Sequence, residues 1–151
     1  MKARGLSFDL RFSGGGDTLE SFKVQADRMG IADCVHLLGF VSDAQLKQEF
    51  ADAAIFAMPS NGEGFGLVYL QAMANGLPCI CGDGDAAKEV VVDQETGFVV
   101  PYANPERLAD SLQHLIEDSE LRQQMGVAGK ARYEACFTKA AFERRFLKIL
   151  V

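Results

Sequence analysis

Short apolar runs of strand length alternate with amphipathic segments of helix length along most of the chain. The run at 54–58 is apolar at every position, which is typical of strands in a parallel sheet that helices cover on both faces. Strands that alternate with helices predict an α/β fold with a doubly wound parallel sheet and right-handed crossovers. The strands are expected at 8–12, 35–40, 54–58, 78–81 and 97–100.

Capping patterns mark where the helices begin and end. Asp17 with Glu20 predicts a capping box, which opens a helix that stops near Gly30. Ser42 with Gln45 forms a second capping-box pattern and opens the next helix. Further helical segments are expected at 66–75, 88–92, 104–116, 120–135 and after 138.

The last third of the chain is predicted to be helical. Asn104 is placed to cap a helix that has Pro105 at its first position. We expect the closing helices to pack on the sheet or to cover an edge, because apolar stripes run along them. One stripe consists of Leu108, Leu112, Leu115 and Ile116, and the other of Phe142, Phe146, Leu147 and Leu150.

The composition indicates one globular domain of 151 residues, with 48% apolar and 24% charged residues. A net charge of −6 argues against a broad nucleic-acid interface, which needs a basic face, but leaves a small local phosphate site open. No run approaches the roughly 20 apolar residues that cross a bilayer, and no signal-peptide core follows the basic start. We therefore expect a cytoplasmic protein, with peripheral attachment to the inner membrane through a further domain left open.

The four cysteines are interpreted as reduced core residues. Cys79 and Cys81 fall on one face of a predicted strand, where small buried side chains are normal. Neither His36 nor His114 stands at a zinc-ligand spacing relative to the cysteines, so no metal site is expected.

Three loops follow predicted strands, at 13–17, 60–66 and 82–85, and parallel strands bring such loops to one rim where ligands bind. Gly14, Gly15 and Gly16 allow close backbone approach before a helix that offers free N–H groups, although a simple flexible turn fits equally well. In the loop at 82–85, Asp83 and Asp85 are interpreted as solvated charges, as is the nearby Glu89.

Glu63 is the strongest candidate for chemistry. It precedes flexible backbone and a helix start, where a carboxylate is stabilised as the anion and can accept hydrogen bonds from hydroxyl groups. The alternative is that Glu63 merely caps the helix. Glu63 and Asp83 could also form the carboxylate pair of a glycosidase, but nothing in the sequence fixes their separation.

Residues 59–78 read PSNGEGFGLVYLQAMANGLP. This segment resembles the donor-site signature of the retaining glycosyltransferases of family four (glycosyl transferases group 1), which is E-G-F-G-L-x-x-x-E-A-M-A-x-G-x-P. The family includes sucrose and glycogen synthases and bacterial lipopolysaccharide and capsule enzymes. Similarity extends to 12–16, 38–41, 97–100 and the closing helices. The resemblance implies the Rossmann-like, nucleotide-sugar-binding C-terminal half of a GT-B fold.

By this resemblance, Glu63 is the catalytic-face residue that contacts hydroxyls of the donor sugar. The backbone at 64–67 meets the sugar and the diphosphate, and 39–41 passes beside the base. The donor is a nucleoside diphosphate sugar, and no cofactor or metal is implied. The expected donor-binding residues are Gly14, Gly15, Gly39, Phe40, Val41, Glu63, Gly64, Phe65, Gly66, Leu67 and Gln71.

Two departures from the family pattern bear on activity. Gln71 occupies the position of the second glutamate, which binds the ribose hydroxyls, so a charge-assisted bond becomes a weaker neutral one. The family's donor domain begins with a further strand and helix whose arginine and lysine neutralise the diphosphate, and Lys2 and Arg4 lie in the wrong context to replace them. Residues 1–151 are therefore expected to form a single donor-binding domain without that unit and without the N-terminal acceptor domain.

The leading hypothesis is thus part of an enzyme that transfers a sugar to an acceptor hydroxyl in polysaccharide or lipopolysaccharide synthesis, with little or no activity alone. Transfer also requires an acceptor held close to the donor, which this domain does not supply. Two alternatives stay open: a non-catalytic nucleotide or sugar-phosphate binding module, and a relative of the NDP-sugar epimerases.

Overall fold

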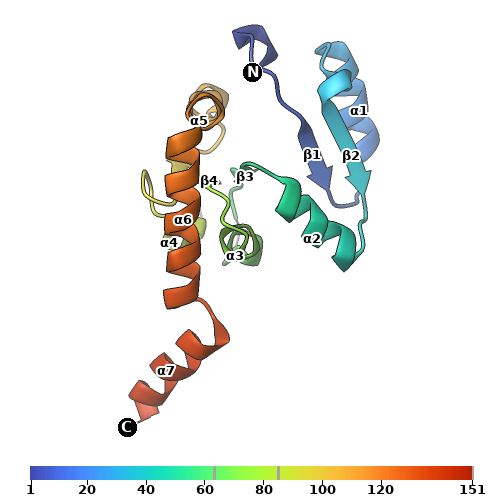
Figure 1. Cartoon of the computed structure of the whole chain (residues 1–151). Helices are drawn as coiled ribbons and strands as arrows, with labels where there is room; N and C mark the ends of the chain where they lie inside the picture. The colour runs from blue at the N-terminus through green and yellow to red at the C-terminus, as the bar shows by residue number, and fades with distance from the viewer. Residues whose placement is uncertain (63, 85, 151) are drawn as a thin grey trace. The chain divides into compact units, whose positions relative to one another are not determined.

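The computed structural model describes residues 1–62, 64–84 and 86–150. The chain forms two compact units, Met1–Glu49 and Phe50–Val151, and each is described by itself. All five predicted strands are present, and every strand pair in the described residues is parallel. Figure 1 shows the β1 and β2 arrows running in the same direction. Hydrogen bonds join β1 (Leu10–Ser13) to β2 (Val35–Gly39) in the first unit, and β3 (Phe56–Met58), β4 (Cys79–Gly82) and β5 (Gly97–Val100), in that order, in the second.

The first unit also contains two α-helices, α1 (Leu19–Arg28) and α2 (Asp43–Asp52), and the division between the units falls in the last turn of α2. The predicted end of α1 is confirmed: Gly30 has a φ of 64°, and Ile31 N–H donates to the Ala26 carbonyl over 3.0 Å. Short 3-10 turns lie at Lys2–Arg4 and Ala32–Cys34.

The two predicted capping boxes of this unit have different outcomes. Ser42 and Gln45 form theirs: Ser42 N–H donates to Gln45 Oε1 over 2.9 Å, and Gln45 N–H to Ser42 Oγ over 3.3 Å. The Asp17 box was wrong, because Thr18 precedes α1 and has helical dihedrals (φ −89°, ψ −10°) without a side-chain cap bond. Thr18 therefore takes the position before the first residue of α1 that the prediction gave to Asp17.

Five helices belong to the second unit. The predicted cap of α5 is confirmed, since Asn104 Oδ1 accepts from Arg107 N–H over 3.0 Å, and Asp118 caps α6 in the same way. Because the Asn104 cap depends on residues three apart, the local sequence was sufficient to predict it, whereas the Asp118 cap was not predicted. The helices are α3 (Leu67–Ala74), α4 (Ala87–Val90), α5 (Pro105–Glu117), α6 (Ser119–Cys136) and α7 (Lys139–Leu150).

The central strand β4 organises the core of the second unit. Ile80 joins a buried cluster with Leu115 of α5 and Met125 of α6. The neighbouring Cys79 points to the other face, where its thiol lies beside the backbone of Tyr69 in α3. Helices therefore cover both faces of this sheet, as predicted, and Cys79 and Cys81 are fully buried. The described cysteines form no disulfide.

Helices α3 and α6 pack unusually closely at Gly126. A Cβ atom added to Gly126 would lie 2.1 Å from the carbonyl oxygen of Gly76, the residue at which α3 turns away with a φ of 74°. One turn later, a Cβ at Gly129 would meet Met73 at 3.6 Å, an ordinary contact distance. The absence of a side chain at Gly126 thus sets how near the two helices come.

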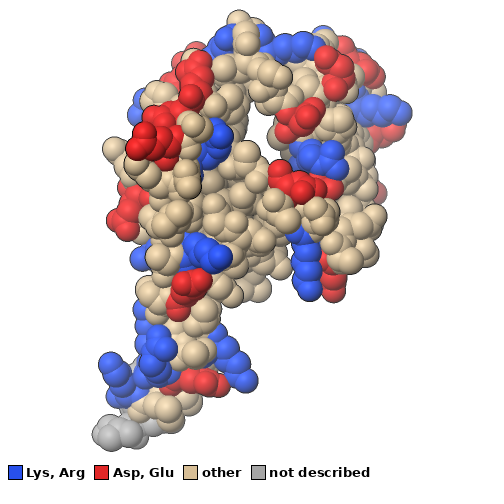
Figure 2. Space-filling model, in the orientation of Figure 1, with Lys and Arg blue, Asp and Glu red and all other residues tan. Residues whose placement is uncertain are grey.

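The last helix departs from the expectation that the closing helices pack on the sheet. Phe142, Phe146 and Leu147 are 63%, 49% and 61% exposed, and the two phenyl rings stack on each other instead. Only Ala141 of the described α7 side chains is buried. Figure 2 shows basic side chains gathered on α7, which carries four Lys or Arg residues and one Glu.

Replacing Gly126 with Ala is expected to lower the free energy of unfolding by about 1–3 kcal/mol, because the methyl group forces α6 away from the Gly76 carbonyl. The matched control is Gly129→Ala in the same helix, where the added methyl makes only ordinary contacts and the better helix propensity of Ala predicts no loss or a gain of up to about 1 kcal/mol. Urea unfolding followed by circular dichroism measures both. Equal effects of the two substitutions would contradict the close contact.

The cysteines should divide into two classes by reactivity. Burial raises the pKa of the Cys79 thiol from 9.0 to about 12, so its reactive thiolate is suppressed, whereas Cys34 and Cys136 are only partly buried. We expect Ellman's reagent to label Cys34 and Cys136 in the folded protein, and Cys79 and Cys81 only after unfolding. Mass spectrometry of labelled peptides identifies the sites, and early labelling of Cys79 would be incompatible with this core.

Candidate functional site

Two of the predicted rim loops meet in the second unit. Strands β3 and β4 are parallel neighbours, so the segments that follow them leave the sheet at the same edge. A Cβ at Gly82 would lie 2.3 Å from the Ser60 carbonyl oxygen, and one at Gly84 would lie 2.7 Å from Asn61 Oδ1. The expectation that the loops at 60–66 and 82–85 share one rim is confirmed for their described residues.

The N-terminus of α3 begins at this rim. Gly66 precedes the helix with a φ of 76°, a left-handed conformation that favours glycine, and it has no side chain to cap the first amides. The Gly66 carbonyl accepts from Tyr69 N–H over 2.9 Å. Phe65 is 44% and Leu67 is 69% exposed. Gly66 itself supplies no side-chain cap, so the helix start, which lies next to exposed side chains, suits an anionic or polar ligand.

Glu63 and Asp85 lie outside the described residues. The proposed contact of Glu63 with a sugar, and its alternative as a helix cap, therefore stay predictions, as does the solvated charge of Asp85. The neighbouring Gly64 is described and exposed.

Gln71 lies on the exposed face of α3, one turn after Leu67. Residues four apart on a helix are neighbours, so the Gln71 amide lies next to the exposed Leu67 side chain near the start of α3. The Gln71 backbone carbonyl is already engaged, because it accepts from Asn75 Nδ2 over 2.8 Å. The side chain of Gln71 is thus exposed, one helical turn after Leu67 and on the same face of α3.

Tyr69 holds α3 against the sheet and was not singled out by sequence reasoning. Its side chain is fully buried, and its hydroxyl donates to the Met58 carbonyl at the end of β3. Its ring also meets Phe56 edge to face, with centroids 5.4 Å apart. The signal in the sequence was weak, since an aromatic residue on an apolar helix face predicts burial but not a hydrogen-bond partner.

Asp83 has a structural partner that the prediction of a solvated loop charge did not include. Its Oδ1 accepts from Tyr102 N–H over 2.9 Å, and its own N–H donates to the Val100 carbonyl. The Lys88 ammonium donates to the Asp83 carbonyl over 3.2 Å. Asp83 therefore fixes the loop after β4 to the segment after β5, although it is exposed, as Glu89 is.

The candidate residues of the first unit lie at the ends of β1 and β2. Gly14 N–H donates to the Gly39 carbonyl over 2.8 Å, which joins the two loops. A Cβ at Gly15 would lie 2.1 Å from Phe40 Cε2, so the Phe40 ring rests directly on the Gly15 backbone. The ring is nevertheless 90% exposed, whereas Val41 is half-buried. Four of the five candidates in this unit are thus in contact or hydrogen-bonded.

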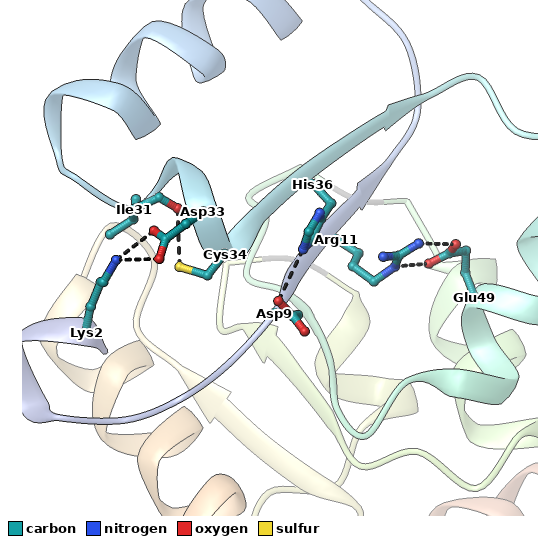
Figure 3. Close-up of polar contacts among 8 residues, drawn as sticks. All are labelled: Lys2, Asp9, Arg11, Ile31, Asp33, Cys34, His36 and Glu49. Carbon is teal, nitrogen blue, oxygen red and sulfur yellow. Dashed lines mark hydrogen bonds and ion pairs between the residues drawn. The ribbon is translucent and has the colours of Figure 1, made fainter.

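Basic side chains of the first unit are engaged in ion pairs (Figure 3). The Lys2 ammonium lies 2.6 Å from Asp33, just before β2 begins, and this pairing holds the pKa of Asp33 below its usual value. Arg11 makes two hydrogen bonds to Glu49, at 2.6 and 2.8 Å, and lowers the pKa of Glu49. Lys2 therefore lies at the opposite end of β2 from the candidate loops of this unit.

Two features are absent from the described residues: a cluster that could hold a metal ion and a helix that could cross a membrane. No three His, Cys, Asp or Glu side chains among them lie close enough together to hold a metal ion. None of the described helices combines the length and the apolar character that crossing a membrane requires.

Parallel strands, helices on both faces of the larger sheet and glycine-rich loops at the carboxyl ends define an α/β protein of the Rossmann-like class. The chain belongs to the glycosyl transferases group 1 family, whose model matches residues 2–132. The resemblance read from 59–78 is thereby confirmed.

Two curated relatives indicate where the chain falls in this family. It is 37% identical over 124 residues to a GDP-mannose-dependent alpha-(1-6)-phosphatidylinositol monomannoside mannosyltransferase of Mycobacterium tuberculosis, covering 78% of this chain and 32% of the relative. It is 37% identical over 129 residues to a D-inositol 3-phosphate glycosyltransferase of Corynebacterium diphtheriae, covering 85% and 30%. The chain spans about a third of the length of these relatives.

Solved structures confirm the fold class. HepE from Anabaena, crystallised with UDP, superimposes with a TM-score of 0.86 at 23% identity over 95% of this chain and 40% of HepE. At this identity the likeness establishes the fold, which is that of GT-B glycosyltransferases. The extent of the domain, and the absence of a first strand-helix unit from it, stay predictions.

Removing the Tyr69 hydroxyl is expected to loosen α3, although the Met58 carbonyl keeps a second donor, the Ser60 N–H at 2.7 Å. We expect Tyr69→Phe to lower the free energy of unfolding by about 0.5–1.5 kcal/mol, the net contribution of a typical intramolecular hydrogen bond. Tyr102→Phe is the matched control, because Tyr102 is 53% exposed and water can replace any lost bond. Urea unfolding measures both, and a neutral Tyr69→Phe would show that the hydroxyl does not fasten α3.

Proposed function

We propose that this chain is the nucleotide-sugar donor-binding domain of a retaining, metal-independent glycosyltransferase. The parent enzyme transfers a sugar from a nucleoside diphosphate sugar to an acceptor hydroxyl, and the domain by itself is inactive. The observation that carries the proposal is the N-terminus of α3, which begins after Gly66, a residue without a side-chain cap, next to the joined loops after β3 and β4. Helix N-termini bind phosphate through backbone N–H groups and the helix dipole, without a metal ion.

Each described candidate has a role in this proposal. The first-turn amides after Gly66 bind the donor diphosphate and sugar, and Gln71 binds the ribose hydroxyls through its exposed amide. Phe40 offers an exposed ring beside Gly15 on which a nucleotide base stacks. Glu63 is proposed to contact donor-sugar hydroxyls, on the strength of the family signature.

The relatives supply further support. One is named as GDP-mannose-dependent, and HepE has been crystallised with UDP and with UDP-glucose. A nucleoside diphosphate sugar is the ligand class that these proteins share. The proposal places the enzyme in lipid or glycan synthesis on the cytoplasmic side of the cell, with the acceptor bound by a further domain.

A non-catalytic nucleotide-binding module is the second candidate, and one observation favours it. Gln71 takes the place of the family's second glutamate, and the neutral amide gives up the stronger hydrogen bond of a carboxylate to ribose. Such a module would bind the nucleotide but would support no transfer even with the acceptor domain present.

Changing Gln71 to Glu is expected to tighten nucleotide binding about fivefold, or roughly 1 kcal/mol, because a carboxylate forms stronger bonds to the ribose hydroxyls. Isothermal titration with UDP, GDP and ADP and their sugars measures the change. Gln123→Glu is the matched control: it adds the same charge to an exposed position beside Gly76, at the far end of α3.

Equal affinities for the two variants would reject the ribose contact. If the unmodified chain binds no nucleotide at millimolar concentration, the titration is repeated with upstream sequence restored. Binding only in the longer protein would support the proposed site with essential upstream cations, and no binding in either protein would reject donor binding altogether. Sugar transfer by the longer protein would exclude the non-catalytic module.

A further inference from the structure

Arg132 on α6 forms hydrogen bonds to the C-terminal end of the short helix α4. Its Nε donates to the Val90 carbonyl over 2.9 Å, and its Nη2 donates to the Glu89 carbonyl over 2.7 Å. Both carbonyls belong to the last turn of α4, which leads from the loop after β4. The planar guanidinium suits two acceptors at once, so Arg132 fixes both the position and the direction of α4.

The same guanidinium also lies over an aromatic ring that reaches the other rim loop. Arg132 Cζ is 5.4 Å from the centroid of the Phe137 ring, a cation–π contact. Phe137 in turn meets Phe65 nearly edge to face, with centroids 6.3 Å apart and an interplanar angle of 69°. Phe65 belongs to the glycine-rich loop that leads into α3. A continuous path of contacts thus joins the two rim loops through Arg132.

The helix that carries Arg132 is itself held firmly in place. Helix α6 is held against α3 at Gly126, where the Gly76 carbonyl leaves no space for a side chain. Phe65 is flanked by glycines at 64 and 66 and would otherwise have few backbone restraints. The Phe137 ring therefore supplies a side-chain restraint at a point where the backbone itself is permissive.

We propose that Arg132 is a positioning residue that couples the loop containing Phe65 to the loop after β4, so that both take up their ligand-binding arrangement together. The consequence for ligand rests on the proposed function, with a nucleoside diphosphate as the ligand, but the coupling itself does not. Arg132 acts through Phe137 and through the carbonyls of α4, and it needs no contact with the ligand.

A second arginine on the same helix provides a matched control. Arg122 Nη1 donates to the Leu115 carbonyl over 2.6 Å and to the Ile116 carbonyl over 3.3 Å at the end of α5. Arg122 therefore forms hydrogen bonds to carbonyls at the end of a helix, as Arg132 does. Unlike Arg132, it lies at the start of α6, near Gly76 and away from the rim. A merely structural role for Arg132 predicts that the two arginines behave alike.

The first experiment needs no ligand. The chain contains no Trp, so Phe65→Trp introduces a single fluorescent reporter into the glycine-rich loop. In this background we expect Arg132→Ala to shift the emission to longer wavelength and to lower its anisotropy, and Arg132→Lys to give an intermediate change. Arg122→Ala should leave both unchanged. Hydrogen exchange of the Val91 amide, which donates to the Ala87 carbonyl, reports on α4 in the same samples.

The Phe137→Leu variant tests the contact with Phe65 separately from the Arg132 bonds to α4. It also takes the place of Arg132→Ala if that variant fails to fold. Phe137→Leu removes the ring contact with Phe65 but keeps the Arg132 bonds to α4, so we expect the Trp emission to shift while Val91 exchange stays unchanged. An unshifted emission in both Arg132→Ala and Phe137→Leu overturns the proposal. So does an equal shift in Arg122→Ala.

The second experiment titrates UDP and GDP into the variants without the Trp reporter. We expect Arg132→Ala to weaken binding at least tenfold, Arg132→Lys to restore part of the affinity, and Arg122→Ala to stay within twofold of the parent. Normal affinity in Arg132→Ala overturns the positioning role. If the parent chain binds neither nucleotide, donor binding by this chain fails, and the fluorescence and exchange results still decide the coupling.

Discussion

The close approach of α3 and α6 at Gly126 is the constraint on which the second unit depends. A backbone carbonyl of one helix fills the place of a side chain on the other, so the spacing between the helices is fixed by atoms that cannot move independently. From this contact α3 extends to the rim, where the preceding Gly66 supplies no side-chain cap. The other helix places Met125 in the core and Arg132 beside the rim loops.

The candidate residues of each unit are largely backbone groups. In the first unit, glycines after β1 bring main-chain groups to the surface, while the cationic side chains of Lys2 and Arg11 form ion pairs with carboxylates. In the second unit, the start of α3 provides the positive end of a helix dipole. Backbone groups of this kind can suit a phosphate locally even in a chain whose formal charge is −6.

Prediction from sequence succeeded where the determining interactions are local. The caps at Ser42 and Asn104 depend on side chains three residues away, and the strands were visible as apolar runs between glycines. Prediction failed at Asp17, since the residue that precedes α1 is Thr18. Prediction from sequence also assigned Asp83 no hydrogen-bond partner, since Tyr102 comes beside Asp83 only when β4 and β5 pair.

The sequence by itself determined the α/β class, the family and the loops that carry the candidate site, because glycine spacing, apolar periodicity and a long signature are properties of neighbouring residues. Only the tertiary structure decided which of these loops touch, that the Phe40 ring rests on Gly15, and that the apolar stripe of α7 is exposed. It also brought Arg132 to α4 and to Phe137. These contacts join residues distant in sequence, and they depend on how closely helices and strands pack, which no local pattern records.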